Sequence, residues 1–352
     1  MSLKVARVIF TGADHDPKFI FERREELPNV RKGEVLVRIR LATICGSDLH
    51  TISGNRPEQT PLVLGHEAVG EIVTDKRPQP LTPGSRVTFS IISSCRKCQR
   101  CRLELPQKCK QLEKLGHLTL NRRSGFHGCY ATHVVLGCGT HVSLVPSKLS
   151  DRMVAPINCA LATMVNAVEC GKTNVQDKTA LVLGAGLLGI YGCALLRDNG
   201  YDEVFCCDID RNRLKFVSKF GGKAICPEDF LDDEFLVDSV DTVIEVCGNP
   251  DVIQDGYRRL RHGGVLVLVG LVHPNSNLSI TGEQIIRKCI TIRGVHNYTP
   301  RHLDRALEFL SRTAESYPYE ELVSPNPFSL EEIEKAITET NKKLYHRSCV
   351  KP

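Results

Sequence analysis

Tryptophan is absent from this chain of 352 residues, and aromatic residues make up only 6% of it. Lys and Arg are spread along the sequence, with a formal net charge of +5, and form no basic block. Because nucleic-acid surfaces need clustered cations and stacking rings, we expect no nucleic-acid partner. A modest positive charge still suits an anionic cofactor or substrate.

Long apolar runs are missing as well. No stretch of 18 or more uninterrupted apolar residues occurs, so no membrane partner is predicted. The opening segment MSLKVARVIF turns polar too early for a secretory signal, and we expect a cytoplasmic protein. Its 16 cysteines are then expected as reduced thiols, because several stand at metal-ligand spacing.

The pattern of apolar and polar residues changes near residue 177. Before it, short alternating runs such as residues 35–40 and 85–92 are separated by Pro and Gly, which predicts a β-rich domain. After it, apolar strands alternate with helix-patterned segments, which predicts a parallel sheet with crossover helices. Two domains are expected at this length.

A glycine-rich turn follows the apolar run TALVL and opens a helix-patterned stretch, as Gly184-Ala185-Gly186-Leu187-Leu188-Gly189. Gly184 allows a tight turn, Gly186 lets the backbone approach a pyrophosphate, and Gly189 allows the helix to pack closely on the sheet. The helix N-terminus then attracts phosphate. This setting predicts a dinucleotide site, and the alternative is a plain strand-to-helix turn.

Asp208 lies 19 residues after Gly189, at the end of the apolar run EVFCC. A carboxylate there accepts hydrogen bonds from ribose hydroxyls and repels a 2′-phosphate, which predicts NAD over NADP. Arg211 and Arg213 stand close enough to leave some use of NADP open. Asp210 is expected to cap the helix that starts at Arg211.

Four cysteines, Cys95, Cys98, Cys101 and Cys109, form the pattern C-x2-C-x2-C-x7-C. Four thiolates this close in sequence can surround one tetrahedral zinc ion with no open position, which is typical of a structural site. An iron–sulfur cluster, a nucleic-acid-binding zinc knuckle and free thiols are the alternatives.

A second set of metal-ligand types is dispersed along the chain. It comprises Cys45 in ICGSDLH, His66 and Glu67 in LGHEAVG, and Cys159 in APINCALA. Taken singly, each has a plain structural explanation as a buried small residue or a loop histidine.

Taken together, these motifs resemble the medium-chain zinc alcohol dehydrogenase superfamily over essentially the whole chain. CGSDLH, GHEAVG, the four-cysteine lobe, GAGLLG and VLVGL occur in the order that the family has. PINCALATMVNAVE, RLELPQKC and RGVHNY are similar to a subgroup of alcohol dehydrogenases associated with phosphonate catabolism.

The resemblance implies an α/β fold with two domains. A β-rich GroES-like catalytic domain is expected at 1–155, with a zinc lobe at about 93–112. A Rossmann domain with a doubly wound parallel sheet, which binds NAD, is expected at 156–297. Residues 298–352 are expected to return to the catalytic domain.

The resemblance also implies a catalytic zinc ion on Cys45, His66 and Cys159, and therefore two zinc ions per chain. Glu67 is the neighbouring carboxylate that can transiently ligate or tune this metal. The fourth position is left for water or the substrate oxygen.

Other residues receive supporting roles from the same resemblance. Ser47 and His50 match the positions of a proton relay from the alcohol to solvent. Asp48 is expected to orient the far ring nitrogen of His66. The cofactor contacts that the resemblance implies are those of Leu187, Leu188, Arg213, Cys247, Val269, Gly270 and Leu271, and of Arg347 with the pyrophosphate.

The expected function is oxidation of an alcohol to an aldehyde or ketone with hydride transfer to NAD, in a homodimer or homotetramer. A polyol or amino-alcohol dehydrogenase of the sorbitol or threonine type is an alternative. So is a non-catalytic dinucleotide-binding protein. A zinc-free, NADPH-linked quinone reductase is disfavoured by the metal ligands and by Asp208. His117, His127, His133 and His141 show no metal spacing and are expected to be ordinary histidines.

Overall fold

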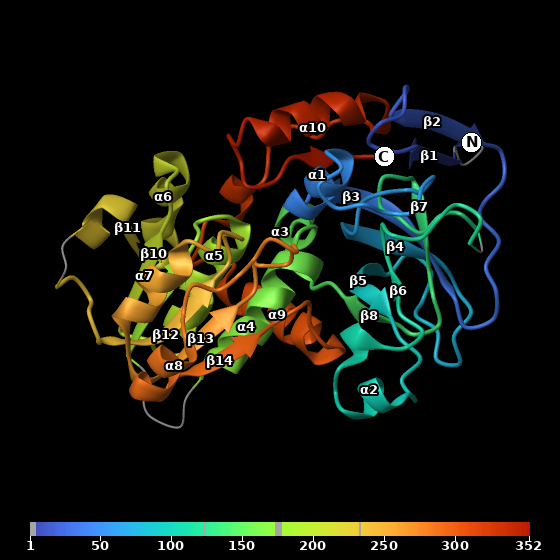
Figure 1. Cartoon of the computed structure of the whole chain (residues 1–352). Coiled ribbons are helices and arrows are strands. Elements are labelled where there is room, and N and C mark those ends of the chain that lie inside the picture. Colours follow the sequence, from blue (N-terminus) through green and yellow to red (C-terminus); the bar gives the residue numbers. More distant parts are fainter. Residues whose placement is uncertain (1–4, 123, 173–177, 232–233) are drawn as a thin grey trace. The chain divides into compact units, whose positions relative to one another are not determined.

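The computed structural model describes residues 5–122, 124–172, 178–231 and 234–352. The chain divides into two compact units (Figure 1): residues 1–159 with 299–352 form the first, and residues 160–298 form the second. The divisions therefore follow residues 159 and 298, where the sequence leads us to expect them after residues 155 and 297.

The first unit is built on an antiparallel sheet of seven strands, ordered β15-β3-β4-β5-β6, with β7 beside β3 and β8 beside β5. A separate hairpin joins β1 to β2. The strand bounds are β1 Val5–Phe10, β2 Phe19–Arg24, β3 Val35–Thr43, β4 Glu67–Asp75, β5 Arg86–Ser93, β6 Glu113–Lys114, β7 His133–Leu136, β8 Thr140–Leu144 and β15 Cys349–Val350.

Strand β3 shows why these segments form a half-buried sheet. Its sequence VLVRIRLAT places Arg38 and Arg40 on the exposed side, while Val37 and Ile39 are buried. This alternation has the period of two that a strand with one wet face requires. The buried side packs in a cluster with Phe89 of β5.

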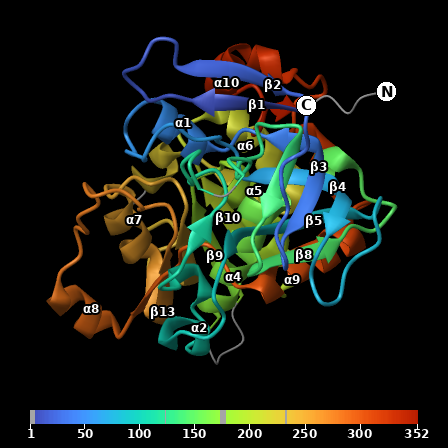
Figure 2. The ribbon, with the colours of Figure 1, turned by 90° about the vertical axis from the view of Figure 1, so that its right-hand side faces the viewer.

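The C-terminal segment belongs to the first unit. Figures 1 and 2 show α10 beside the hairpin of β1 and β2, and Arg23 of β2 pairs with Glu331 at 3.1 Å. β15 then pairs with β3. The helices of this unit are α1 Gly46–Ile52, α2 Gln99–Arg102, α3 Asp151–Val154, α9 Pro300–Thr313 and α10 Ile333–Asn341.

The second unit is a six-stranded sheet, ordered β11-β10-β9-β12-β13-β14, in which every pairing is parallel. In chain order this is 3-2-1-4-5-6, the doubly wound Rossmann arrangement, so the expected α/β fold class is confirmed. The strand bounds are β9 Thr179–Leu183, β10 Glu203–Cys207, β11 Lys223–Ile225, β12 Val240–Glu245, β13 Leu260–Leu268 and β14 Thr291–Gly294.

Helices cover both faces of this parallel sheet. A side chain added at Gly192 of α5 would touch Val182, whereas one at Gly256 of α7 would touch Leu183. Successive strand residues point to opposite faces, so α5 and α7 lie on opposite sides of the sheet. The helix bounds are α4 Ala162–Gly171, α5 Leu187–Asp198, α6 Arg211–Val217, α7 Val252–Arg259 and α8 Gly282–Lys288.

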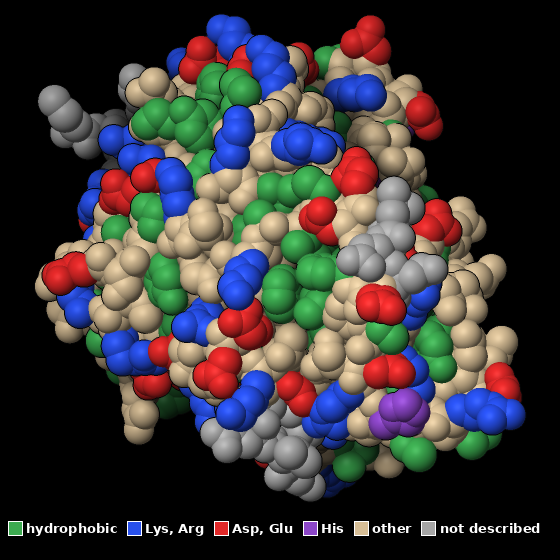
Figure 3. All heavy atoms as spheres, turned by 90° about the vertical axis from the view of Figure 1, so that its left-hand side faces the viewer, with side chains coloured by type: hydrophobic (Ala, Val, Ile, Leu, Met, Phe, Trp, Pro, Cys, Tyr) green, Lys and Arg blue, Asp and Glu red, His purple; other side chains and the backbone are tan. Residues whose placement is uncertain are grey.

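One helical stretch, Asp151–Gly171, is long and apolar enough to span a membrane by length and composition alone. Within it, 72% of the most apolar window is buried inside the structure, as in a core helix. Figure 3 shows a face of the molecule on which Lys and Arg side chains are interspersed with Asp and Glu, so opposite charges alternate over that face.

Candidate metal centres and dinucleotide site

The register of β3 on β4 brings two distant metal-ligand types together. Thr43 and Glu67 are directly paired across the two strands. Cys45 follows the end of β3 by two residues, and His66 immediately precedes β4, so both lie beside this pair. Cys45 and His66 are buried, at 6% and 1% exposure.

Cys159 approaches from a π-helical turn, Ile157–Leu161, a local distortion that is frequent at functional sites. The side-chain amide of Asn158 donates to the carbonyl oxygens of His66 (3.0 Å) and Phe89 (2.9 Å), which ties this turn to the sheet. As a result, one ligand atom from each of Cys45, His66, Glu67 and Cys159 lies within 4.8 Å of the others.

Asp48 faces the far nitrogen of His66, as expected from the sequence. His66 Nδ1 and Asp48 Oδ1 lie 3.3 Å apart, and both side chains are 1% exposed. The other carboxylate oxygen of Asp48 accepts hydrogen bonds from the Cys45 backbone N–H (3.1 Å) and the Tyr130 hydroxyl (2.9 Å). Burial lowers the pKa of His66, but Asp48 outweighs it and raises the pKa to about 10. Nε2 is therefore the ring atom left for a metal.

Arg347 also contacts this cluster. Its Nε and Nη2 donate to the two carboxylate oxygens of Glu67 at 2.8 and 2.9 Å, and Nη2 lies 3.5 Å from Cys45 Sγ. Burial raises the pKa of Glu67 to about 7, although the charge of Arg347 lowers it. A hydrogen bond from Cys159 and the charge of Arg347 lower the pKa of Cys45. The contact of Arg347 with a pyrophosphate stays a prediction.

The chemistry of this cluster fits a zinc ion. Two thiols, an imidazole and an adjacent carboxylate are donors that zinc prefers, and three permanent ligands leave one position open, as in catalytic sites. Buried thiolates also need a nearby positive charge. Arg347 is already engaged by Glu67, so a dication on Cys45, His66 and Cys159 would meet that need.

The four-cysteine lobe converges as well. The Sγ atoms of Cys95 and Cys109 lie 3.4 Å apart, those of Cys98 and Cys101 3.6 Å, and those of Cys98 and Cys109 4.0 Å. Sulfurs about 2.3 Å from a tetrahedral zinc ion would be about 3.8 Å apart. Backbone N–H groups of Lys110 and Cys101 lower the pKa of Cys98 to about 6, which favours the thiolate that binds metal.

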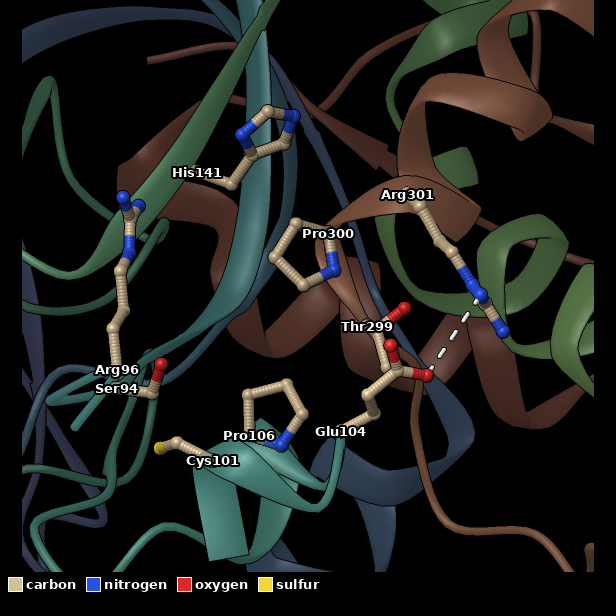
Figure 4. Close-up of a pocket in the computed structure, with 9 residues that line it drawn as sticks. All are labelled: Ser94, Arg96, Cys101, Glu104, Pro106, His141, Thr299, Pro300 and Arg301. Carbon is tan, nitrogen blue, oxygen red and sulfur yellow. Dashed lines mark ion pairs between the residues drawn. The ribbon is translucent and has the colours of Figure 1, made fainter. Parts of the chain in front are cut away.

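A hollow of about 370 Å³ lies between this lobe, β8 and the start of α9 (Figure 4). Among the residues with predicted roles, only Cys101 lines it. Arg301 reaches Glu104 across it at 4.0 Å, which joins the lobe to α9. The full lining is Ser94, Arg96, Cys101, Glu104, Pro106, His141, Thr299, Pro300 and Arg301. The hollow is thus distinct from the cluster around Cys45.

The glycine turn of the second unit has the geometry that its residues suggest. Gly184 has φ +114°, and a side chain there would meet Cys247. A side chain at Gly189 would meet the Gly184 carbonyl at 1.8 Å, whereas nothing lies within 4 Å of the position that one at Gly186 would occupy. Gly186 therefore leaves space at the helix N-terminus for an approaching group.

Asp208 ends β10 beside this turn. Its Oδ2 accepts from the Ala185 N–H (2.7 Å) and its Oδ1 from the Asp210 N–H (2.8 Å). Arg213 Nη1 lies 3.8 Å from Asp208 Oδ2. The Asp210 side chain accepts from the Asn212 N–H, which confirms it as the cap of α6.

Glu245, at the end of β12, is a residue that the sequence analysis overlooks. It is fully buried, and its carboxylate accepts from the N–H groups of Gly248 (2.5 Å) and Gly270 (3.0 Å). These two loops carry Cys247, Val269, Gly270 and Leu271. A carboxylate within the buried run DTVIEV was the signal available.

A polar group beside His66 is also missed. The ring of His117 lies 6.1 Å from that of His66, and Nδ1 of His117 lies 2.6 Å from Glu58 Oε1. Arg56 contacts both Glu58 and His117. His117 is a histidine with a largely buried side chain and a carboxylate partner and is not one of the clustered metal-ligand residues, and only the fold brings it and residues 56–58 near His66.

Ser47 and His50 lie on α1, which begins directly after Cys45. Ser47 is half-buried and His50 is exposed. In the described part of the chain, neither the Ser47 hydroxyl nor the His50 ring forms a hydrogen bond with another residue. Both are thus free for outside partners.

The fold and these clusters define a two-domain α/β protein with two candidate metal centres and a sheet of the dinucleotide-binding type. Two family profiles match, the alcohol dehydrogenase GroES-like domain at residues 31–147 and the glucose dehydrogenase C-terminus at residues 153–346. The chain belongs to the medium-chain zinc-dependent alcohol dehydrogenase superfamily. It is an oxidoreductase of the type that acts on CH–OH groups.

Individual relatives agree with this family. An L-threonine 3-dehydrogenase of Legionella pneumophila is 28% identical over 77% of this chain and 79% of its own length. The 5-exo-hydroxycamphor dehydrogenase of Pseudomonas putida is 25% identical over 87% of this chain and 88% of its own. The structure of an alcohol dehydrogenase from Thermotoga maritima shares the fold, with a TM-score of 0.90 at 23% identity, covering 99% of this chain and 100% of that one.

Proposed function

We propose that Cys45, His66 and Cys159 bind the catalytic zinc ion of an NAD-linked alcohol dehydrogenase, with Glu67 beside the metal. A zinc ion held there supplies a Lewis acid that lowers the pKa of a substrate hydroxyl. The four-cysteine lobe binds a second zinc ion with a structural role. Asp48 fixes the ring of His66, and Arg347 keeps Glu67 in place.

The substrate gives up a proton as well as a hydride. Ser47 relays the proton: it takes up the substrate's hydroxyl proton as it releases its own toward His50, which is exposed on the same helix and passes a proton to water. NAD, when bound at the glycine turn, supplies the nicotinamide carbon that accepts the hydride. Gly184, Gly186 and Gly189 shape the pyrophosphate site, and the cofactor contacts proposed within the same unit are those of Leu187, Leu188, Arg213, Cys247, Val269, Gly270 and Leu271.

We also propose that Asp208 selects NAD over NADP, because its carboxylate repels a 2′-phosphate. The nearby Arg213 is already within 3.8 Å of that carboxylate, which supports this preference. We expect the protein to act in the cytosol, with its thiols reduced, as a homodimer or homotetramer.

The observation that carries the proposal is the convergence of four residues from three separated segments within 4.8 Å. We expect two zinc ions per chain and NADH formation with a suitable alcohol. Cys45→Ser should keep one zinc ion and lose turnover. The matched control is Cys138→Ser, because Cys138 is an exposed cysteine outside both clusters. Full turnover in Cys45→Ser would end the proposal.

An amino alcohol is the second candidate for the substrate, because the threonine dehydrogenases align with about three quarters of the chain. Oxidation of L-threonine, measured beside simple alcohols and polyols, distinguishes the two. A kcat/KM for L-threonine well above the values for uncharged alcohols would favour the amino-alcohol function.

A further inference from the structure

A tight turn carries Lys114 to the edge of the proposed catalytic centre. The His117 N–H donates to the Lys114 carbonyl at 3.2 Å, which closes the turn. Between them, Gly116 has φ +75°, and a side chain there would meet the Gly65 carbonyl at 2.8 Å. Gly65 directly precedes His66, so the turn packs against the backbone that presents a metal ligand.

The neighbouring charges are already matched. Glu58 Oε1 lies 2.6 Å from His117 Nδ1 and 3.4 Å from Arg56 Nε. Arg56 Nη2 lies 3.4 Å from His117 Nε2, and because a guanidinium can only donate, Nε2 accepts and the proton of a neutral ring lies on Nδ1. The Glu58 carboxylate is therefore balanced by Arg56, with His117 uncharged.

Lys114 is different, because its ammonium forms no ion pair or hydrogen bond within residues that the structure describes. Burial and the charge of Arg56 lower the pKa of Lys114, while the thiolates of Cys159 and Cys45 raise it. The turn that packs Gly116 on Gly65 brings this lysine to the backbone that carries His66. A zinc dication would offset the two thiolates, and Arg347 already offsets Glu67. The remaining charge of the centre is the Asp48 carboxylate, which accepts from the Cys45 N–H and the Tyr130 hydroxyl, so the Lys114 ammonium has no direct acceptor in the described part of the chain.

We infer that Lys114 determines substrate specificity by binding an anionic group, a carboxylate or a phosphoryl group, on the alcohol that the enzyme oxidises. This inference rests on the proposed function, which identifies the centre as the place where the substrate hydroxyl binds. Lys114 acts on affinity and takes no part in the hydride or proton transfers.

The test compares charged and uncharged alcohols of equal length. ω-Hydroxy carboxylates and ω-hydroxyalkyl phosphates are each measured against the corresponding neutral diols. A charge-assisted hydrogen bond predicts that kcat/KM is about 10- to 100-fold higher for the carboxylates or the phosphates than for the matching diols. Most of this difference should come from a lower KM. Lys114→Gln should remove this advantage and leave kcat/KM for the diols unchanged, while Lys114→Arg should retain most of it.

The matched control is Lys148→Gln, which removes the same charge from an exposed lysine of the same unit. It should leave both series unchanged. A second readout is independent of turnover: calorimetric binding of butanoate and of inorganic phosphate to the zinc-loaded protein should weaken about tenfold or more in Lys114→Gln. The anion that binds more tightly identifies the group.

Two results would overturn the inference. One is a wild-type enzyme that oxidises diols as well as the acids; the other is a Lys114→Gln variant that loses both series equally, which would indicate a structural role. If no alcohol is oxidised, the proposed function fails by itself, and the calorimetric comparison still decides whether Lys114 binds anions.

Discussion

The carboxylate of Asp48 makes three contacts at the proposed catalytic site. It faces Nδ1 of His66, accepts the backbone N–H of Cys45 and accepts the hydroxyl of Tyr130, all without solvent. Hydrogen-bonded carboxylates of this kind hold a metal-binding imidazole in one tautomer and one orientation. The affinity of the proposed catalytic site should therefore depend on a residue that never touches the metal.

We predict that Asp48→Asn weakens zinc binding at this site about 10- to 100-fold, because the amide replaces a charged acceptor by a neutral one. Competition with a chromogenic chelator measures the affinity. The lobe zinc serves as an internal control and should be released as in the wild type. If the variant released the catalytic-site zinc no more readily than the wild type does, the role of Asp48 would be contradicted.

At the scale of an element, β12 is fixed by a carboxylate at each end. Asp241, near its start, accepts from the backbone N–H groups of Lys178 and Thr179 at 2.8 Å each, and from Arg261 Nε. Glu245, at its end, holds two loops of the dinucleotide site. One end therefore matters for stability and the other for cofactor binding.

We predict that Glu245→Gln raises KM for NAD about tenfold, since the side-chain amide has one acceptor where two N–H groups now bind carboxylate oxygens. KM for the alcohol and the unfolding temperature should change much less. Glu203→Gln is the control, because Glu203 lies on the same sheet with its side chain 42% exposed. An unchanged KM for NAD would show that the loops keep their positions without Glu245.

We predict that Asp241→Asn destabilises the protein by about 1–3 kcal/mol at pH 7, through loss of charge-assisted hydrogen bonds. Burial raises the pKa of Asp241, but Arg261 and the two N–H groups outweigh it, so the pKa lies below the ordinary value of about 3.8. The contribution is therefore complete above about pH 3.8 and is lost as the pH falls through the lower, folded value.

Denaturant unfolding across this range tests the sign. The difference between the wild type and Asp241→Asn should be constant near neutral pH and should shrink in acid. Asp202→Asn is a control, because Asp202 is 66% exposed and its pair with Lys178 at 3.7 Å is a surface ion pair of small value. A difference that grows on acidification would contradict the assignment.

For the whole molecule, the features that can be predicted from the sequence alone are those whose residues lie close together in the chain. The turn from Gly184 to Gly189 and the four-cysteine lobe each lie within a few residues, so spacing alone determines their geometry. The convergence of Cys45, His66 and Cys159 was reached only through family resemblance. It depends on strand register and on a π-helical turn, neither of which leaves a periodic signal.

The functional contacts that the sequence does not predict depend on packing between distant segments. Lys114 becomes notable only because the turn at Gly116 packs against Gly65, and Arg347 reaches Glu67 only because β15 pairs with β3. No pattern in one sequence reports such contacts between segments that lie tens to hundreds of residues apart. Glu245 was within reach, since a carboxylate inside a buried apolar strand must have partners.

The two proposed zinc ions should differ in what their loss does to the molecule. The lobe lies on β5 and contacts α9 through the pair of Glu104 and Arg301, so its metal stabilises the first unit. We predict that Cys98→Ser leaves one zinc ion per chain. Loss of a structural metal is among the largest effects of a single substitution. It should lower the free energy of unfolding by about 4 kcal/mol and the unfolding temperature by about 10 °C.

Below that temperature, kcat of Cys98→Ser should stay within a few-fold of the wild type, because Cys45, His66 and Cys159 are untouched. Zinc content, thermal unfolding and initial rates on one preparation separate stability from chemistry. A variant that unfolds like the wild type but has lost turnover would reverse the assignment and make the lobe the reactive centre. The four-thiolate set makes that result unexpected, because it leaves no open position at which a substrate oxygen could bind.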